Sequence, residues 1–129
     1  MPMTPGHFLV YPADLPHIGA SMHWWVRYRQ KQRAMRWFGV LPAAARRFAV
    51  AEVTIRRVLG PRQRPMDDDN LRTACKGLRD ALKACGYLVE DSPTWARFRY
   101  EEDASRRALG PRVEVVIVYP PDQALRRGR

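Results

Sequence analysis

Residues 67–91 read DDDNLRTACKGLRDALKACGYLVED, and the middle of this stretch has the most regular apolar pattern in the chain. Apolar side chains recur there at helical spacing: Leu71, Ala74, Cys75, Leu78, Leu82 and Cys85. This spacing is typical of one face of an α-helix. The next residue, Gly86, is a common residue type just beyond a helix end. The pattern therefore predicts an amphipathic helix over residues 69–85.

Segments rich in Val, Ile and Phe lie on both sides of that helix and predict the strands of a sheet. We expect strands over residues 8–11, 48–59, 96–101 and 113–119, and a first helix over 21–38 with Ser21 as its N-cap. The last strand is an almost unbroken apolar run, which is typical of a central strand. The order β-α-β-α-β-β predicts an α/β fold on a small mixed sheet. We expect one domain over residues 1–129, with a frayed basic tail over about 122–129.

The composition fits a small folded protein inside the cell. The chain has 129 residues, of which 46% are hydrophobic, and no apolar run approaches the roughly 18 residues of a membrane span. The N-terminus does not resemble a secretion signal, so we expect no membrane partner and a cytoplasmic location. Cys75 and Cys85 would lie about 15 Å apart along one helix, too far for a disulfide, and are expected to be core residues.

Charge gives the first indication of a partner. Lys and Arg number 23 against 13 Asp and Glu, which leaves a net charge of +10. Such an excess is typical of proteins that bind a polyanion such as nucleic acid. Of the 23 basic residues 20 are Arg, whose forked guanidinium suits phosphate. A GC-rich genome is an alternative explanation for the ratio of Arg to Lys, although it does not explain the net charge.

The basic residues are concentrated in one acid-free stretch. No acidic residue occurs between Leu15 and Ala51. Aromatic residues, Trp24, Trp25, Tyr28 and Trp37, are interleaved there with basic ones, Arg27, Arg29, Lys31, Arg33 and Arg36. Basic and aromatic groups together suit contact with a nucleic-acid backbone and stacking on bases. The alternative is an amphipathic helix that buries its aromatic residues against the sheet.

The acidic run Asp67-Asp68-Asp69 stands out on so basic a chain. Asp68 or Asp69 can cap the following helix, but one cap does not require three carboxylates that repel one another. If the segment that enters the helix is extended, Asp67 and Asp69 project to the same side. Converging carboxylates suit Mg²⁺, which prefers oxygen ligands. Arg62 and Arg64, just before the run, are placed to position a nucleic-acid strand.

A second acidic pair, Glu90-Asp91, follows the helix. A helix of about 17 residues separates its two ends by roughly 25 Å. Asp91 can therefore approach Asp67 only if the residues after Gly86 double back along the helix.

Three groups of residues along this stretch resemble the core signature of the RusA family of Holliday junction resolvases. They are Asp67, Asp69, Asn70 and Leu71; then Asp80, Ala81 and Leu82; then Gly86, Tyr87, Glu90 and Asp91. The motif-rich match covers about residues 62–91. The resemblance implies a RusA-like fold and a homodimeric, Mg²⁺-dependent DNA endonuclease that nicks four-way junctions symmetrically, with Mn²⁺ expected to substitute. Many members of the family are carried by phages and prophages.

The resemblance also implies roles for single residues. Asp67, Asp69 and Asp91 match the catalytic, metal-binding aspartates of the family. Lys76 lies four residues before Asp80, as the family's functional lysine does, whereas counting forward from Asn70 would select Thr73. A solvated helix lysine is the alternative reading of Lys76.

The chain also departs from the family. Its loop segment Ser21-Met22-His23-Trp24 lacks the Asn that the family usually carries after a Ser, so no catalytic role is assigned to His23.

The expected function is therefore that of a metal-dependent endodeoxyribonuclease that resolves Holliday junctions in recombination and repair, in a bacterium or a phage-infected host cell. One alternative is a non-catalytic, basic nucleic-acid-binding protein, which explains the charge but predicts no clustered acids. A second alternative is a RusA-like nuclease that cuts other branched DNA.

Overall fold

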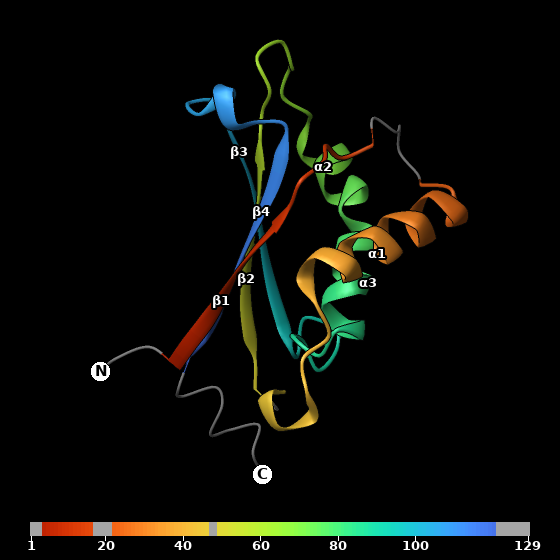
Figure 1. Ribbon diagram of the computed structural model, residues 1–129, viewed down its shortest axis with the longest axis vertical. Helices are drawn as coiled ribbons and strands as arrows, with labels where there is room; N and C mark the ends of the chain where they lie inside the picture. Colours follow the sequence, from red (N-terminus) through yellow and green to blue (C-terminus); the bar gives the residue numbers. More distant parts are fainter. Residues whose placement is uncertain (1–3, 17–21, 47–48, 121–129) are drawn as a thin grey trace.

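The computed structural model describes residues 4–16, 22–46 and 49–120, which form one layer of helices against one sheet (Figure 1). In chain order the elements are β1 (Thr4–Tyr11), α1 (Trp24–Phe38), the 3₁₀ turn η1 (Ala43–Ala45), β2 (Ala51–Val58), α2 (Asp68–Ala74), α3 (Lys76–Ala84), β3 (Ala96–Asp103), the 3₁₀ turn η2 (Arg107–Leu109) and β4 (Arg112–Tyr119). The predicted α/β class and the order of strands and helices are confirmed, except that the second helix is divided in two.

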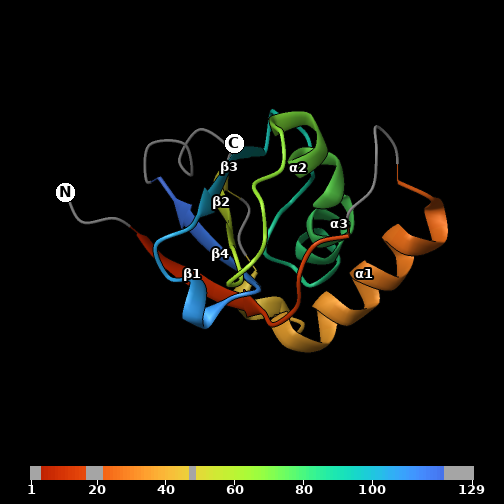
Figure 2. The ribbon, with the colours of Figure 1, turned by 90° about the horizontal axis from the view of Figure 1, so that it is seen from above.

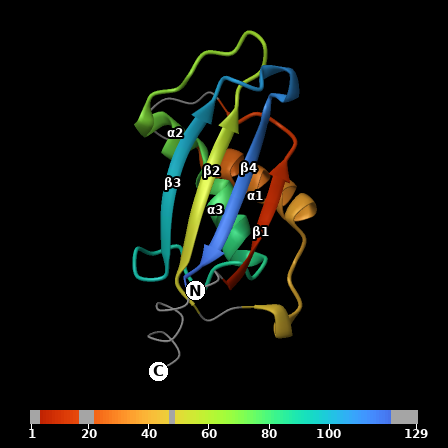
Figure 3. The same ribbon diagram turned by 90° about the vertical axis from the view of Figure 1, so that its left-hand side faces the viewer.

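The four strands form a mixed sheet in the order β1-β4-β2-β3. Strand β4 pairs antiparallel with both β1 and β2, whereas β2 and β3 are parallel. Figure 3 shows this order from the face that the helices leave uncovered. The prediction that residues 113–119 form a central strand is confirmed. Strand β3 is an edge strand with α2 beside it, whereas α3 lies behind the middle of the sheet.

Helices α1, α2 and α3 pack on one face of the sheet, and the core lies between the two layers (Figure 2). Alternate residues of β2, Val53 and Ile55 among them, point into it and are at most 1% exposed. Leu78 and Leu82 of α3 meet them from the helical layer. Cys75 and Cys85 are free and fully buried, so the prediction that they are core residues is confirmed.

The helix predicted over residues 69–85 is interrupted at Cys75. The side chain of Gln30, on α1, lies at the break: its Nε2 donates to the carbonyl of Ala74 at 2.7 Å, and its Oε1 accepts from the N–H of Leu78 at 3.1 Å. A Cβ at Gly77 would lie 2.6 Å from a backbone oxygen of α1, so only glycine allows this approach. The prediction of one continuous helix was wrong. The side chain that satisfies the backbone groups at the break, Gln30, lies more than 40 residues away in the sequence.

Helix α1 begins at Trp24 rather than at residue 21. Its N-cap is His23, whose Nδ1 accepts from the N–H of Trp25 at 3.4 Å. The predicted cap, Ser21, lies outside the described residues, as do the expected start of the second strand at residue 48 and the basic tail 122–129.

A buried arginine fixes the segment that leads to the acidic run. Arg57, in β2, is fully buried, and its guanidinium donates to Asp14 at 2.9 Å and to Glu102 at 2.6 Å. It also donates to the carbonyl of Arg64 at 3.2 Å, and Glu102 accepts the N–H of Met66 at 3.0 Å. Two residues of the loop between β2 and α2 are therefore tied to the sheet immediately before Asp67.

Glu114, buried in β4, makes stability depend on pH. Hydrogen bonds from Arg106, and further ones from Arg112 and Arg56, hold the pKa of Glu114 at about 2, below its ordinary 4.5. Because the folded pKa is the lower one, this stabilisation is complete above pH 4.5 and is lost as the pH falls toward 2.

We expect Glu114→Gln to lower the unfolding free energy by roughly 1–3 kcal/mol at pH 7. The gap to the wild type should narrow as the pH falls from 4.5 to 2. Thermal unfolding of both proteins at pH 7, 4 and 2.5 checks this, and a gap that is independent of pH would contradict it.

Candidate functional site

The acidic run lies exposed at the start of α2. Asp67 is the N-cap: its Oδ1 accepts from the N–H of Asn70 at 2.8 Å, and its Oδ2 accepts from the Asn70 side chain at 3.1 Å. Asp68 and Asp69 occupy the first helical turn, where the helix dipole favours negative charge.

The backbone is extended only at Asp67, so the assumption of an extended run, on which the predicted convergence of Asp67 and Asp69 rested, was wrong. Within this turn Asp68 pairs with Arg72 at 3.2 Å, one helical turn ahead. Lys76 is half-buried in the first turn of α3. The break at Cys75 therefore separates Lys76 from Asp69, and the two residues do not lie on one continuous helix.

Asp91 lies beside the middle of α3. Its Oδ2 is 3.4 Å from Nε of Arg79, five residues before the end of that helix. The chain after Gly86 therefore does double back toward α3. Gly86 makes the turn possible with a φ of 93°, which favours glycine.

The surroundings of Asp91 are partly buried and charged. Burial raises the pKa of Asp91, Arg79 opposes this shift, and the neighbouring carboxylate of Asp80 adds to it. Asp80 is itself held by two hydrogen bonds from Arg27, at 2.6 and 2.8 Å. This ion pair ties α1 to α3 beside Asp91.

The three predicted metal ligands are not gathered into one group. Among the residues that the structure describes, no three His, Cys, Asp or Glu side chains lie close enough to hold a metal ion together. Mg²⁺, however, usually takes only one or two protein carboxylates and completes its shell with water and substrate phosphates. The exposed acidic run fits that smaller set of oxygen ligands.

The aromatic residues of α1 face outward. The exposed fractions of Trp24, Trp25, Tyr28 and Trp37 lie between 42% and 72%. The helix instead buries Gln30, Ala34 and Phe38. The alternative in which these four aromatic residues pack against the sheet is therefore wrong, and α1 presents them beside its basic residues.

The basic residues predicted to contact DNA differ in how free they are. Arg27 is engaged with Asp80, and Arg29 lies over the ring of Trp25, 4.6 Å from its centroid. Arg33 and Arg36 are exposed on α1, and Lys31 is half-buried. Arg62 and Arg64 are exposed in the loop between β2 and α2.

Sequence reasoning missed the residues that surround Asp91. Arg79 of α3 donates to the hydroxyl of Tyr100, and Phe98 lies next to Tyr100 with its ring nearly parallel. The alternation of Phe98 and Tyr100 along the strand was visible in the sequence and placed both on one face. Nothing in the sequence placed that face against α3.

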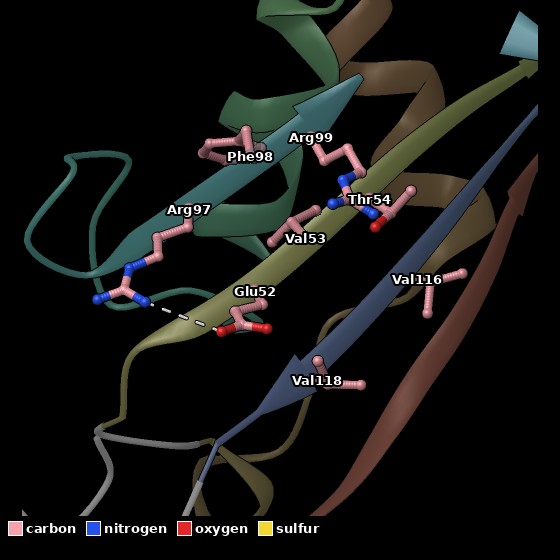
Figure 4. Close-up of a pocket in the computed structure, with 8 residues that line it drawn as sticks. All are labelled: Glu52, Val53, Thr54, Arg97, Phe98, Arg99, Val116 and Val118. Atoms are coloured by element: carbon pink, nitrogen blue, oxygen red, sulfur yellow. Dashed lines mark ion pairs between the residues drawn. The ribbon is translucent and has the colours of Figure 1, made fainter. Parts of the chain in front are cut away.

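A separate hollow of about 350 Å³ lies on the uncovered face of the sheet (Figure 4). Arg97 and Glu52 pair across its rim at 3.9 Å, and Val116 and Val118 form its apolar side. None of the predicted carboxylates lines this hollow.

The sequence matches no protein-family model and no curated protein. None of the described helices is long and apolar enough to span a bilayer. A function must therefore be inferred from the fold and from where it places the acidic and basic residues.

Proposed function

We propose that this chain is a divalent-metal-dependent DNA endonuclease of the RusA type that resolves four-way junctions. The observation that carries the proposal is the exposure of Asp67, Asp68 and Asp69 together on a chain of net charge +10. Asp67 alone caps the helix, so capping does not account for the other two carboxylates. A protein that only binds nucleic acid gains nothing from exposed acids that repel phosphate.

In this proposal Mg²⁺ or Mn²⁺ binds together with the DNA, held by Asp67 and Asp69, with Asp91 as the third carboxylate. When bound, such an ion lowers the pKa of a water for attack on the phosphodiester and stabilises the leaving oxygen. Lys76 neutralises charge on the phosphate, and Arg62 and Arg64 position the strand. The reaction would take place in the cytoplasm of a bacterium or a phage-infected cell.

The test is incubation with a labelled four-way junction, a flapped duplex and a plain duplex, each with Mg²⁺ and with a chelator. We expect paired nicks in the junction only when Mg²⁺ is present. Cleavage of the flapped duplex alone would favour the reading as a nuclease of other branched DNA. Binding without cleavage under any metal would refute the nuclease.

A non-catalytic nucleic-acid-binding protein is the second candidate, and a specific observation favours it. The described carboxylates form no preassembled metal centre, whereas α1 presents exposed aromatic and basic side chains in one helix. The same incubation distinguishes the nuclease from the non-catalytic binding protein, because the latter binds DNA and does not cut it.

Binding should depend steeply on salt, because each neutralised phosphate releases counterions. We expect Arg33→Gln combined with Arg36→Gln to reduce the slope of log affinity against log salt by about two. Fluorescence anisotropy with a labelled junction, from 50 to 300 mM salt, measures the slope. Arg99→Gln, on the uncovered face of β3, is the control and should leave the slope unchanged. If the double variant keeps the wild-type slope, DNA binds elsewhere.

We expect the active species to be a homodimer with two-fold symmetry, because resolution needs two cuts in strands related by the approximate two-fold axis of the junction. Mixed dimers of wild type and Asp69→Asn should nick one strand and leave the junction unresolved. Denaturing and native gels of the same reaction distinguish a nick from resolution. Paired nicks by a protein that sediments as a monomer with the junction bound would contradict the dimer.

A further inference from the structure

A cleft of about 460 Å³ opens at the edge of the sheet, between β3, the helices α2 and α3, and the segment that follows α3. Three arginines and two aromatic residues line it together with Asp91: Arg72, Arg79, Arg97, Phe98 and Tyr100. The cleft is separate from the basic face of α1, because none of its lining residues belongs to that helix.

The two helical arginines of the cleft are held in place before any ligand binds. The guanidinium of Arg72 lies over the ring of Tyr100, 5.1 Å from its centroid, and that of Arg79 lies over the ring of Phe98 at 5.7 Å. Arg79 also donates to the Tyr100 hydroxyl at 2.5 Å. A guanidinium stacked on a ring keeps its N–H donors in its own plane, where they can still meet an anion.

Each arginine of the cleft has an acidic partner: Arg79 pairs with Asp91 at 3.4 Å, Arg72 with Asp68 at 3.2 Å and Arg97 with Glu52 at 3.9 Å. The pairs of Arg72 and Arg97 are exposed to solvent and therefore weak, so both guanidinium groups can still bind an anion in the cleft. In addition, Nε of Arg79 is buried and lies 3.4 Å from Oδ2 of Asp91, in an ion pair that lacks hydrogen-bond geometry. An anion in the cleft would offer this N–H a better-aligned acceptor.

We infer that this cleft is a binding subsite for a backbone phosphate of nucleic acid, held by Arg72 and Arg79. The inference rests on the proposed function and gives it a substrate-binding site. Asp91 lines the cleft, and Arg72 reaches it from α2 while pairing with Asp68. A phosphate held by the two arginines would therefore lie between Asp91 and the acidic run, which the protein does not bring into contact by itself.

The test omits metal, so that it does not depend on catalysis. The 5′-phosphorylated tetranucleotide of thymidine is titrated in the presence of a chelator into wild type, Arg72→Gln, Arg79→Gln and the control Arg99→Gln. Arg99 lies next to Tyr100 in the same strand but points to the opposite face of the sheet. We expect each cleft variant to lose about tenfold in affinity, as for a charge-assisted hydrogen bond, and the control to match the wild type.

A residue-specific measurement accompanies the titration. In ¹H–¹⁵N spectra of arginine side chains, the Nε–H signals of Arg72 and Arg79 should shift with the tetranucleotide, while that of Arg99 should not. Arg72 is exposed, and its removal is not expected to unfold the protein. If Arg79→Gln proves unstable, the result for Arg72→Gln alone decides the test.

Equal affinities for Arg72→Gln and Arg99→Gln, with no shift at Arg72 or Arg79, would overturn the inference. The junction-nicking assay on the wild type is scored separately. Loss of affinity in the cleft variants together with an inactive wild type would keep the phosphate subsite and reject the nuclease. An active wild type with unchanged affinity in the cleft variants would keep the nuclease and reject the phosphate subsite.

Discussion

Asp91→Asn is expected to reduce the nicking of a four-way junction at least ~100-fold while the junction still binds. Asn keeps the shape of the side chain and removes the charge that would hold a metal. Asp67→Asn and Asp69→Asn should have the same effect. Asn is also a good N-cap, so Asp67→Asn preserves the start of α2, and its loss of activity would not come from unfolding.

Asp68→Asn is the matched control, because Asp68 lies between the two proposed ligands and already pairs with Arg72. Single-turnover rates in saturating Mg²⁺, with anisotropy for affinity, measure both quantities. Wild-type rates in any one of the three variants would remove that residue from the site. An essential Asp68 with a dispensable Asp69 would show that the family alignment of this run is off by one residue.

Arg57→Met should lower the unfolding free energy by about 3–5 kcal/mol, the usual cost of leaving the partners of a buried ion pair unpaired. Asp14 and Glu102 would then face each other without the guanidinium that now bridges them. The loop that carries Arg64 and Met66 would also lose its link to β2. Urea denaturation followed by circular dichroism measures the change.

A triple variant, Arg57→Met with Asp14→Asn and Glu102→Gln, controls for the stranded charges. It should regain a substantial part of the loss, because neutral side chains tolerate burial better than unpaired carboxylates. A loss below about 1 kcal/mol in Arg57→Met would mean that water replaces the guanidinium and that the cluster does not hold the loop.

The sequence predicted the elements well where their pattern was local. The apolar spacing of residues 71–85 and the unbroken run of β4 each indicated their element without knowledge of any partner. The break at Cys75 could not be predicted, because the side chain that hydrogen-bonds the backbone there belongs to α1. Arg57 points into the core from β2, and its two acidic partners come from segments more than 40 residues away on either side.

The sequence predicted which residues belong to the candidate site but not how they are arranged in space. That Asp91 returns along α3 followed from no local rule, since the turn depends on where Gly86 and Tyr87 pack. The sequence predicts an extended acidic run, whereas Asp67 caps the helix, which therefore starts one residue earlier than predicted. For α1, the sequence spacing does not distinguish exposed from buried aromatic residues, and only the fold shows that they are exposed.

The two buried cysteines allow local opening of the folded chain to be measured by thiol modification. Cys75 lies at the break between α2 and α3, and burial raises the pKa of its thiol to about 12, while Cys85 follows the end of α3 and its thiol pKa is also raised by burial. Because the thiolate is the reactive form, an aromatic disulfide reagent can modify either one only after local opening. The two modification rates therefore report separately how often each end of α3 opens, without any added label.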